Sequence, residues 1–260
     1  MAFERRLGAG AVRARKGPPP FPVITAYDAP FARCAEEAGI DVLLVGDTLG
    51  HVALGFSSTV PVDLEDMCRH AAAVVRSTRK AHVIVDLPFG SYEAADEDAV
   101  RSAVLLVKAG ASSVKLEGGV RVASRIAAIA AAGIPVVGHI GVLPQTAALD
   151  QGFKRKRDRE LLLADARAVE AGGAFAVVLE GIDAAIGAEI TQMLSIPTIG
   201  IGSGPNCDAQ VLVLYDALGL YPDPPPFVKR YAELGAIATD ALRTYASEVR
   251  EGTFPPHKSG

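Results

Sequence analysis

The 260-residue chain contains no tryptophan, only three cysteines and few aromatic residues of any kind. Cys34, Cys68 and Cys207 are far apart and have no CxxC spacing, so we expect neither a disulfide framework nor a zinc site. No apolar run approaches about 20 residues without a charged or turn residue, so we expect no membrane-spanning helix and no membrane partner. The N-terminus also lacks the apolar segment of a signal peptide. We therefore expect a soluble, cytoplasmic protein.

The chain also lacks a strong charge of either sign. Its 26 Lys and Arg residues against 30 Asp and Glu residues give a net charge of −4. This balance gives no electrostatic reason to expect a nucleic acid as partner. Half of the residues are apolar, which is enough to form the core of one large α/β domain.

Short apolar runs alternate with helical patterns along most of the chain. Runs rich in Val, Ile and Leu predict strands, and glycines close several of the helices between them. The predicted strands cover residues 23–25, 42–45, 82–86, 113–117, 135–140, 174–180, 197–201 and 210–215. Helices are predicted at residues 30–38, 62–79, 94–109, 120–132 and 160–171. Eight strand–helix units favour a closed (β/α)8 barrel, the TIM barrel.

The two ends of the chain differ from this repeat. Residues 1–20 are basic and then rich in glycine and proline, which predicts an N-terminal arm before the first strand. A proline run at 221–226 cannot continue a helix and precedes a last predicted helix at 227–250. We expect a single barrel domain over residues 1–260. Because the proline run is stiff, we also hypothesise that the last helix is exchanged between subunits.

Acidic residues stand at the ends of three predicted strands. Asp47, Asp86 and Glu117 each end or closely follow an apolar run. The carboxyl ends of parallel strands meet at one end of a barrel, where ligands bind. One Asp in such a place is usually a helix cap or a turn residue, but three acids on different strands are harder to explain in this way. Three oxygen ligands there suit a divalent cation such as Mg²⁺.

Further polar residues are predicted at the same end of the barrel. Lys115 and Glu117 are two residues apart in a strand, so their side chains share a face. A cation beside a metal-binding acid can hold the carboxylate or the enolate oxygen of a substrate. His139 and Glu180 end two later strands and complete the set.

Several short motifs occur in order along nearly the whole chain. They are TAYD at 25–28, VGDTLG at 45–50, DLPF at 86–89, VKLEGG at 114–119, GHIG at 138–141, VLE at 178–180 and IPTIGIG at 196–202. Together they resemble the ketopantoate hydroxymethyltransferase family. The resemblance implies a TIM barrel of the phosphoenolpyruvate/pyruvate-domain type, Mg²⁺ as cofactor and a large homo-oligomer, a decamer. It also implies hydroxymethyl transfer from 5,10-methylenetetrahydrofolate to 3-methyl-2-oxobutanoate, giving 2-dehydropantoate for pantothenate and coenzyme A biosynthesis.

The resemblance also implies roles for single residues. The metal-site acids of the family match Asp47, Asp86 and, through a water molecule, Glu117. Its substrate-binding positions match Asp47, Thr48, Asp86, Lys115 and His139. Its proposed catalytic acid or base matches Glu180.

The chain departs from the family pattern at several positions. Thr48 stands in place of the usual serine, VLPQ at 142–145 in place of LTPQ, and Ser203 in place of an alanine. These changes leave open the acceptor 2-oxo acid and the docking of the donor. The alternative is therefore a related Mg²⁺-dependent aldolase or lyase that acts on another 2-oxo acid with a free aldehyde. A catalytically silent paralogue would have lost some of the acids, and all of them are present.

Overall fold

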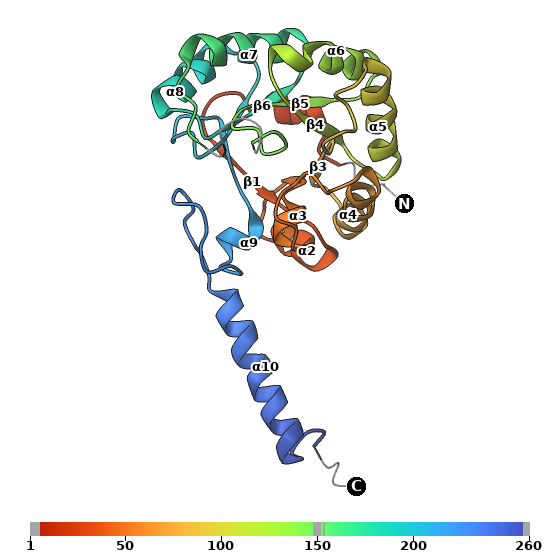
Figure 1. Cartoon of the computed structure of the whole chain (residues 1–260), viewed down its shortest axis with the longest axis vertical. Coiled ribbons are helices and arrows are strands. Elements are labelled where there is room, and N and C mark those ends of the chain that lie inside the picture. The colour runs from red at the N-terminus through yellow and green to blue at the C-terminus, as the bar shows by residue number, and fades with distance from the viewer. Residues whose placement is uncertain (1–5, 148–151, 153, 257–260) are drawn as a thin grey trace. The chain divides into compact units, whose positions relative to one another are not determined.

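The computed structural model is a closed barrel of eight parallel strands (Figure 1). It describes residues 6–147, 152 and 154–256. The strands pair in chain order, and β8 closes the barrel against β1. They are β1 Phe21–Thr25, β2 Val42–Val45, β3 His82–Asp86, β4 Ser113–Glu117, β5 Val136–Gly141, β6 Ala176–Glu180, β7 Thr198–Ile201 and β8 Ala209–Leu212. The predicted TIM barrel is confirmed.

Helices between the strands surround the barrel (Figure 1). Those between strands are α2 Ala29–Glu37, α3 Leu49–Val52, α4 Leu64–Ser77, α5 Asp96–Lys108, the 3-10 turn η1 Val120–Val122, α6 Ala123–Ala131, α7 Arg159–Ala171 and α8 Ala184–Met193. In addition, α1 Ala9–Arg13 precedes β1, and α9 Leu214–Ala217 and α10 Leu234–Glu251 follow β8. Local sequence explains where several of them start. For example, Asp63 and Asp66 form a reciprocal capping box at the start of α4. No described helix is both long and apolar enough to cross a membrane.

The amino ends of the strands are closed by apolar packing. The first residues of β1, β2 and β8 belong to one buried cluster, and Val12 of α1 is fully buried within it. Leu7 N donates to the Lys80 carbonyl oxygen (2.7 Å), which fixes the segment before α1. Strands such as β2 are apolar throughout because both of their faces are buried.

Several predicted boundaries are off by a few residues, and two of them have a clear structural reason. Strand β8 ends at Leu212 rather than at residue 215, because its pairing with β1 stops there and Val213 is already the N-cap position of α9. The last helix begins at Leu234 rather than at residue 227. The preceding segment folds back on the proline run, where Arg230 Nη2 donates to the Tyr221 carbonyl oxygen (2.8 Å).

The chain forms two compact units, one ending at Leu212 and one beginning at Val213. The first contains the barrel and α1 to α8. The second contains α9, the proline run and α10, and no residue of α10 is buried. The candidate active site lies entirely within the first unit.

Candidate active site

Six predicted site residues meet at the carboxyl ends of β2 to β6. They are Asp47, Asp86, Lys115, Glu117, His139 and Glu180. The Asp47 amide donates to Asp86 Oδ2 (3.1 Å), and Lys115 Nζ lies 3.1 Å from Asp86 Oδ1. Lys115 Nζ is also 3.1 Å from His139 Nδ1, and His139 Nε2 is 3.3 Å from Glu180 Oε2. The structure thus brings together side chains from five consecutive strands, while the chemical role of each stays a prediction.

The cluster carries more acid than base, with four carboxyl groups around one ammonium group. Burial, and after it the charge of Asp86, raises the pKa of Asp47 to about 7. Burial and the charge of Asp47 raise the pKa of Glu117 well above its usual value. Burial alone would lower the pKa of Lys115, but Asp86 and Glu117 outweigh it and raise that pKa, so the ammonium stays charged. The site is therefore suited to accept additional positive charge.

The oxygen atoms of these acids fit a divalent cation. In Asp86 and Glu117, one carboxylate oxygen accepts a main-chain N–H. The other oxygen in each, Asp86 Oδ1 or Glu117 Oε1, is buried without a hydrogen bond, although Lys115 Nζ lies beside the first. Among the described residues, no three His, Cys, Asp or Glu side chains form a metal cluster by themselves. Mg²⁺ commonly takes only one or two protein carboxylates and completes its shell with water and substrate oxygens, so this donor set suits it.

His139 links Lys115 to Glu180. An ammonium group can only donate, so His139 Nδ1 accepts from Lys115 and the ring proton resides on Nε2, facing Glu180. Burial and the charge of Lys115 lower the pKa of His139, which keeps the ring neutral. Gly141, at the end of β5, has a φ of +100°, and a Cβ there would lie 2.2 Å from the Glu180 carbonyl oxygen. Glycine at this position therefore allows β5 and β6 to approach each other beside the site.

Two other polar residues follow strand ends, Thr48 after β2 and Asp28 after β1. Thr48 is half-buried at the N-cap position of α3, where its side chain makes no capping hydrogen bond. Asp28 caps α2 by accepting from Phe31 N (2.9 Å), which is the ordinary role of an Asp after a strand.

Two residues of the site were not predicted from the sequence, Gln145 and Tyr92. Both are 2% exposed, and both contact the predicted acids. Gln145 Nε2 donates to Asp47 Oδ2 (2.8 Å), and the Tyr92 hydroxyl donates to Gln145 Oε1 (2.6 Å). The only sequence signal was the position of Gln145 in the motif that follows β5.

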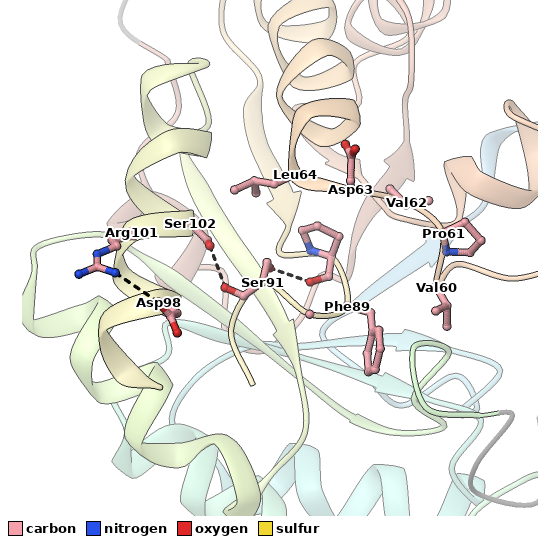
Figure 2. Close-up of a pocket in the computed structure, with 12 residues that line it drawn as sticks. Val60, Pro61, Val62, Asp63, Leu64, Phe89, Ser91, Asp98, Arg101 and Ser102 are labelled. Carbon is pink, nitrogen blue, oxygen red and sulfur yellow. Dashed lines mark hydrogen bonds and ion pairs between the residues drawn. The ribbon is translucent and has the colours of Figure 1, made fainter. Parts of the chain in front are cut away.

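A separate pocket of about 530 Å³ lies on the rim beside β3 (Figure 2). Its described lining comes from residues 60–64, from residues 88–91 and from α5, and includes none of the predicted site residues. Phe89 and Val60 contribute exposed apolar surface to it. The pocket borders the β3–α5 loop, which also supplies Tyr92.

Comparison with known proteins identifies the family of this chain. The sequence pattern of the family described as ketopantoate hydroxymethyltransferase matches residues 10–257. The chain belongs to the ketopantoate hydroxymethyltransferase family. A protein of Ignicoccus hospitalis named 3-methyl-2-oxobutanoate hydroxymethyltransferase is 49% identical over 237 residues, which are 90% of each chain. A protein of Carboxydothermus hydrogenoformans with the same name is 51% identical over 242 residues, 91% of this chain and 88% of that one.

Family membership confirms that the chain is an enzyme, a hydroxymethyltransferase. The crystal structure of 2,3-dimethylmalate lyase, a member of the PEP mutase/isocitrate lyase superfamily, is similar to it with a TM-score of 0.63. The match covers all of this chain and 92% of the lyase at 19% sequence identity, so it bears on the fold alone. It confirms the TIM-barrel fold.

Proposed function

We propose that this enzyme transfers a hydroxymethyl group from 5,10-methylenetetrahydrofolate to 3-methyl-2-oxobutanoate and forms 2-dehydropantoate, in pantothenate biosynthesis. The observation that carries the proposal is the buried cluster of Asp47, Asp86, Glu117 and Lys115 at the carboxyl end of the barrel. It occurs in a chain that is about half identical to proteins named for this reaction.

Asp47 and Asp86 would hold Mg²⁺, with Glu117 acting through a water molecule. When bound, Mg²⁺ would supply Lewis-acid chemistry that favours the enolate of the 2-oxo acid. The raised pKa of Asp47 and the buried oxygen of Glu117 without a hydrogen bond support this assignment. Both observations indicate a site whose negative charge is not neutralised by the protein itself.

Lys115 and Thr48 would orient the acceptor. The Lys115 ammonium stays charged and lies between Asp86 and His139, so it can attract a carboxylate or a developing enolate oxygen. Such an attraction is stronger in a buried site than in water. The Thr48 hydroxyl, at the start of α3, would contact the substrate carboxylate as the family's serine does.

Glu180 would move the proton at C3 of the acceptor. Its side chain is 22% exposed, against 2% for Glu117, so a substrate in the barrel mouth can reach it more easily. His139 Nε2 lies 3.3 Å from Glu180 Oε2 and would help to orient that carboxylate toward the substrate.

The decisive experiment follows deuterium exchange at C3 of 3-methyl-2-oxobutanoate by proton NMR. We expect exchange with Mg²⁺ and none with EDTA, before any folate is added. If exchange is absent even with Mg²⁺ and tetrahydrofolate, the acceptor is a different 2-oxo acid. Comparing turnover on methylenetetrahydrofolate with turnover on formaldehyde then distinguishes this enzyme from an aldolase, which would gain nothing from the folate.

We also propose that α10 joins subunits in a homo-oligomer, by exchange between them. Its residues Leu242, Tyr245 and Val249 are spaced on one helical face and are all exposed. Tyr245→Asp should lower the molar mass measured by light scattering, and Thr244→Asp, which adds the same charge one residue away, should not. A monomeric wild-type protein would contradict the proposal.

A further inference from the structure

Gln145 lies between three of the strand ends that form the candidate active site. Its Nε2 donates to Asp47 Oδ2 (2.8 Å) and to the Leu87 carbonyl oxygen (2.9 Å). Its main-chain amide donates to Glu117 Oε2 (3.1 Å). One buried residue therefore ties together the carboxyl ends of β2, β3 and β4.

The hydrogen-bond partners of Gln145 determine the direction in which its amide faces. The Tyr92 hydroxyl donates to Gln145 Oε1 (2.6 Å) and accepts from Glu117 N (3.2 Å). With the amide reversed, Oε1 would face two acceptors, the Asp47 carboxylate and the Leu87 carbonyl oxygen, and both hydrogen bonds would be lost. Only one orientation of Gln145 therefore satisfies all of its side-chain partners.

The loop that carries Tyr92 is itself fixed by hydrogen bonds. Ser91 Oγ donates to the Pro88 carbonyl oxygen (2.6 Å), and Ser102 Oγ of α5 donates to the Ser91 carbonyl oxygen (2.7 Å). Figure 2 shows both bonds along the wall of the rim pocket. Because the loop is fixed in this way, Tyr92 is a rigid support for Gln145.

Gln145 occupies one carboxylate oxygen of Asp47 and one of Glu117. A group that fixes one oxygen of a carboxylate sets the direction of the other, and such neighbours of metal ligands tune metal affinity. We propose that Gln145, oriented by Tyr92, is a positioning residue that holds Asp47 and Glu117 in the arrangement that binds a divalent cation. This inference rests on the proposed function and adds a positioning residue to its metal site.

The test measures the affinity of the intact enzyme for Mn²⁺, as a probe for Mg²⁺, by electron paramagnetic resonance of the free ion. Gln145→Met keeps the side-chain length and removes the N–H donors, and we expect about 10- to 100-fold weaker binding. Tyr92→Phe removes only the hydroxyl, and we expect about two- to tenfold weaker binding. Gln210→Met is the matched control, because Gln210 Nε2 also donates to a carbonyl oxygen, that of Gly204, but on an exposed side chain. The Mn²⁺ affinity of Gln210→Met should equal that of the wild-type enzyme.

Two further readouts separate positioning from a merely structural role. Since Tyr92 acts through Gln145, the double variant should bind Mn²⁺ no more weakly than Gln145→Met alone. In addition, kcat of Gln145→Met should return toward the wild-type value at high Mg²⁺, while the KM for Mg²⁺ stays raised. A residue that only stabilised the fold would lower the unfolding temperature in EDTA and leave the Mn²⁺ affinity of the folded protein unchanged.

Wild-type Mn²⁺ affinity in Gln145→Met would overturn the inference and leave the proposed function intact. Failure of the wild-type enzyme to bind Mn²⁺ would overturn both. If Gln145→Met does not fold, Gln145→Asn replaces it, because it keeps the amide but is one methylene too short to reach Asp47, Leu87 and Tyr92 together. The same loss of affinity is expected for it, and wild-type affinity in Gln145→Asn would likewise overturn the inference.

Discussion

The two ends of the barrel shift the pKa of a buried aspartate in opposite directions. Asp208, at the amino end, accepts hydrogen bonds from Thr198 N (2.8 Å), Gly17 N (2.8 Å) and Lys16 Nζ (2.9 Å). Burial by itself would raise the pKa of Asp208, but the bonds from Thr198 and Lys16 outweigh it and hold that pKa below its usual value. At the carboxyl end, burial and the charge of Asp86 raise the pKa of Asp47 to about 7.

The opposite pKa shifts of Asp208 and Asp47 distinguish an acid that stabilises the fold from an acid that is available to a ligand. An acid whose oxygens are all satisfied by donors stabilises the fold as an anion, and it needs no ligand. An acid whose charge is disfavoured where it stands costs folding free energy and is retained where a ligand or a cation compensates for it. On this criterion Asp208 at the amino end stabilises the fold, whereas the acids at the carboxyl end belong to the proposed reaction site.

The largest effect is expected from Asp86→Asn, which removes one of the acids at the carboxyl end of the barrel. The amide cannot supply the anionic oxygen that the proposed Mg²⁺ site requires, so kcat should fall by about three orders of magnitude or more. Asp47 and Glu117 still neutralise Lys115, so the variant should remain folded in EDTA. Steady-state kinetics and thermal unfolding check the two halves of this prediction, and a wild-type rate would show that the metal assignment is wrong.

Asp208→Asn should have the opposite profile. It leaves one donor of the Asp208 cluster facing an amide N–H, so the free energy of unfolding at neutral pH should fall by about 3 kcal/mol, with kcat unchanged. Because the pKa of Asp208 is lowered in the fold, this contribution is present above the unfolded pKa and is lost as the pH falls through the folded pKa. The loss in Asp208→Asn, measured by urea unfolding, should therefore shrink in acid.

Asp41→Asn is the control for this measurement. Asp41 pairs with Arg15 (2.7 Å), but both side chains are about one-third exposed, so the loss should stay below about 1 kcal/mol. Equal losses in the two variants would contradict the special role of the Asp208 cluster.

Removal of divalent cations should expose the raised pKa of Asp47. The folded state of the cation-free enzyme holds this proton up to about pH 7, whereas the unfolded chain releases it near pH 4, so the ionised form is disfavoured only in the fold. Stability in EDTA should therefore fall as the pH rises from about 4 to about 7. Mg²⁺ at about 100 times its Kd should then add about 2.7 kcal/mol at pH 8. Calorimetry at several pH values measures both effects, and Asp47→Asn should remove this part of the pH dependence.

The positions of the acids at the carboxyl end of the barrel could be predicted from the sequence, because parallel topology brings the carboxyl ends of all strands to the same place. Asp86, Glu117 and Glu180 each close an apolar run, and the barrel leaves them no other location. The same pattern does not distinguish a site residue from a cap, as Asp28 shows by capping α2. Both roles place an Asp directly after a strand.

Gln145 and Tyr92 could not be predicted in this way. They lie in loops, where no periodicity specifies which side chain turns inward, and their contacts join residues 53 positions apart in the chain. The start of α10 was missed for a related reason. The main-chain amides of Tyr231 and Leu234 donate to the Ala217 and Leu218 carbonyl oxygens, so they make no helical hydrogen bonds before α10. Loop contacts of this kind become visible only when the fold is known.

The smallest effect is expected from Ser203→Ala, at a position where the resemblance to the family implies an alanine. Ser203 Oγ donates to the Leu179 carbonyl oxygen (2.7 Å) and accepts from Ile182 N (3.1 Å), so it joins the residues on either side of Glu180. Loss of these bonds should lower the unfolding free energy by about 1 kcal/mol, because a buried N–H loses its partner. Since these hydrogen bonds join the Ser203 hydroxyl only to main-chain groups, kcat should stay within about twofold. Ser195→Ala, which removes an exposed hydroxyl bonded to Glu170 (2.7 Å), is the control for stability and should cost less. A tenfold fall in kcat for Ser203→Ala would instead show that, in this chain, the position of Glu180 depends on the added hydroxyl.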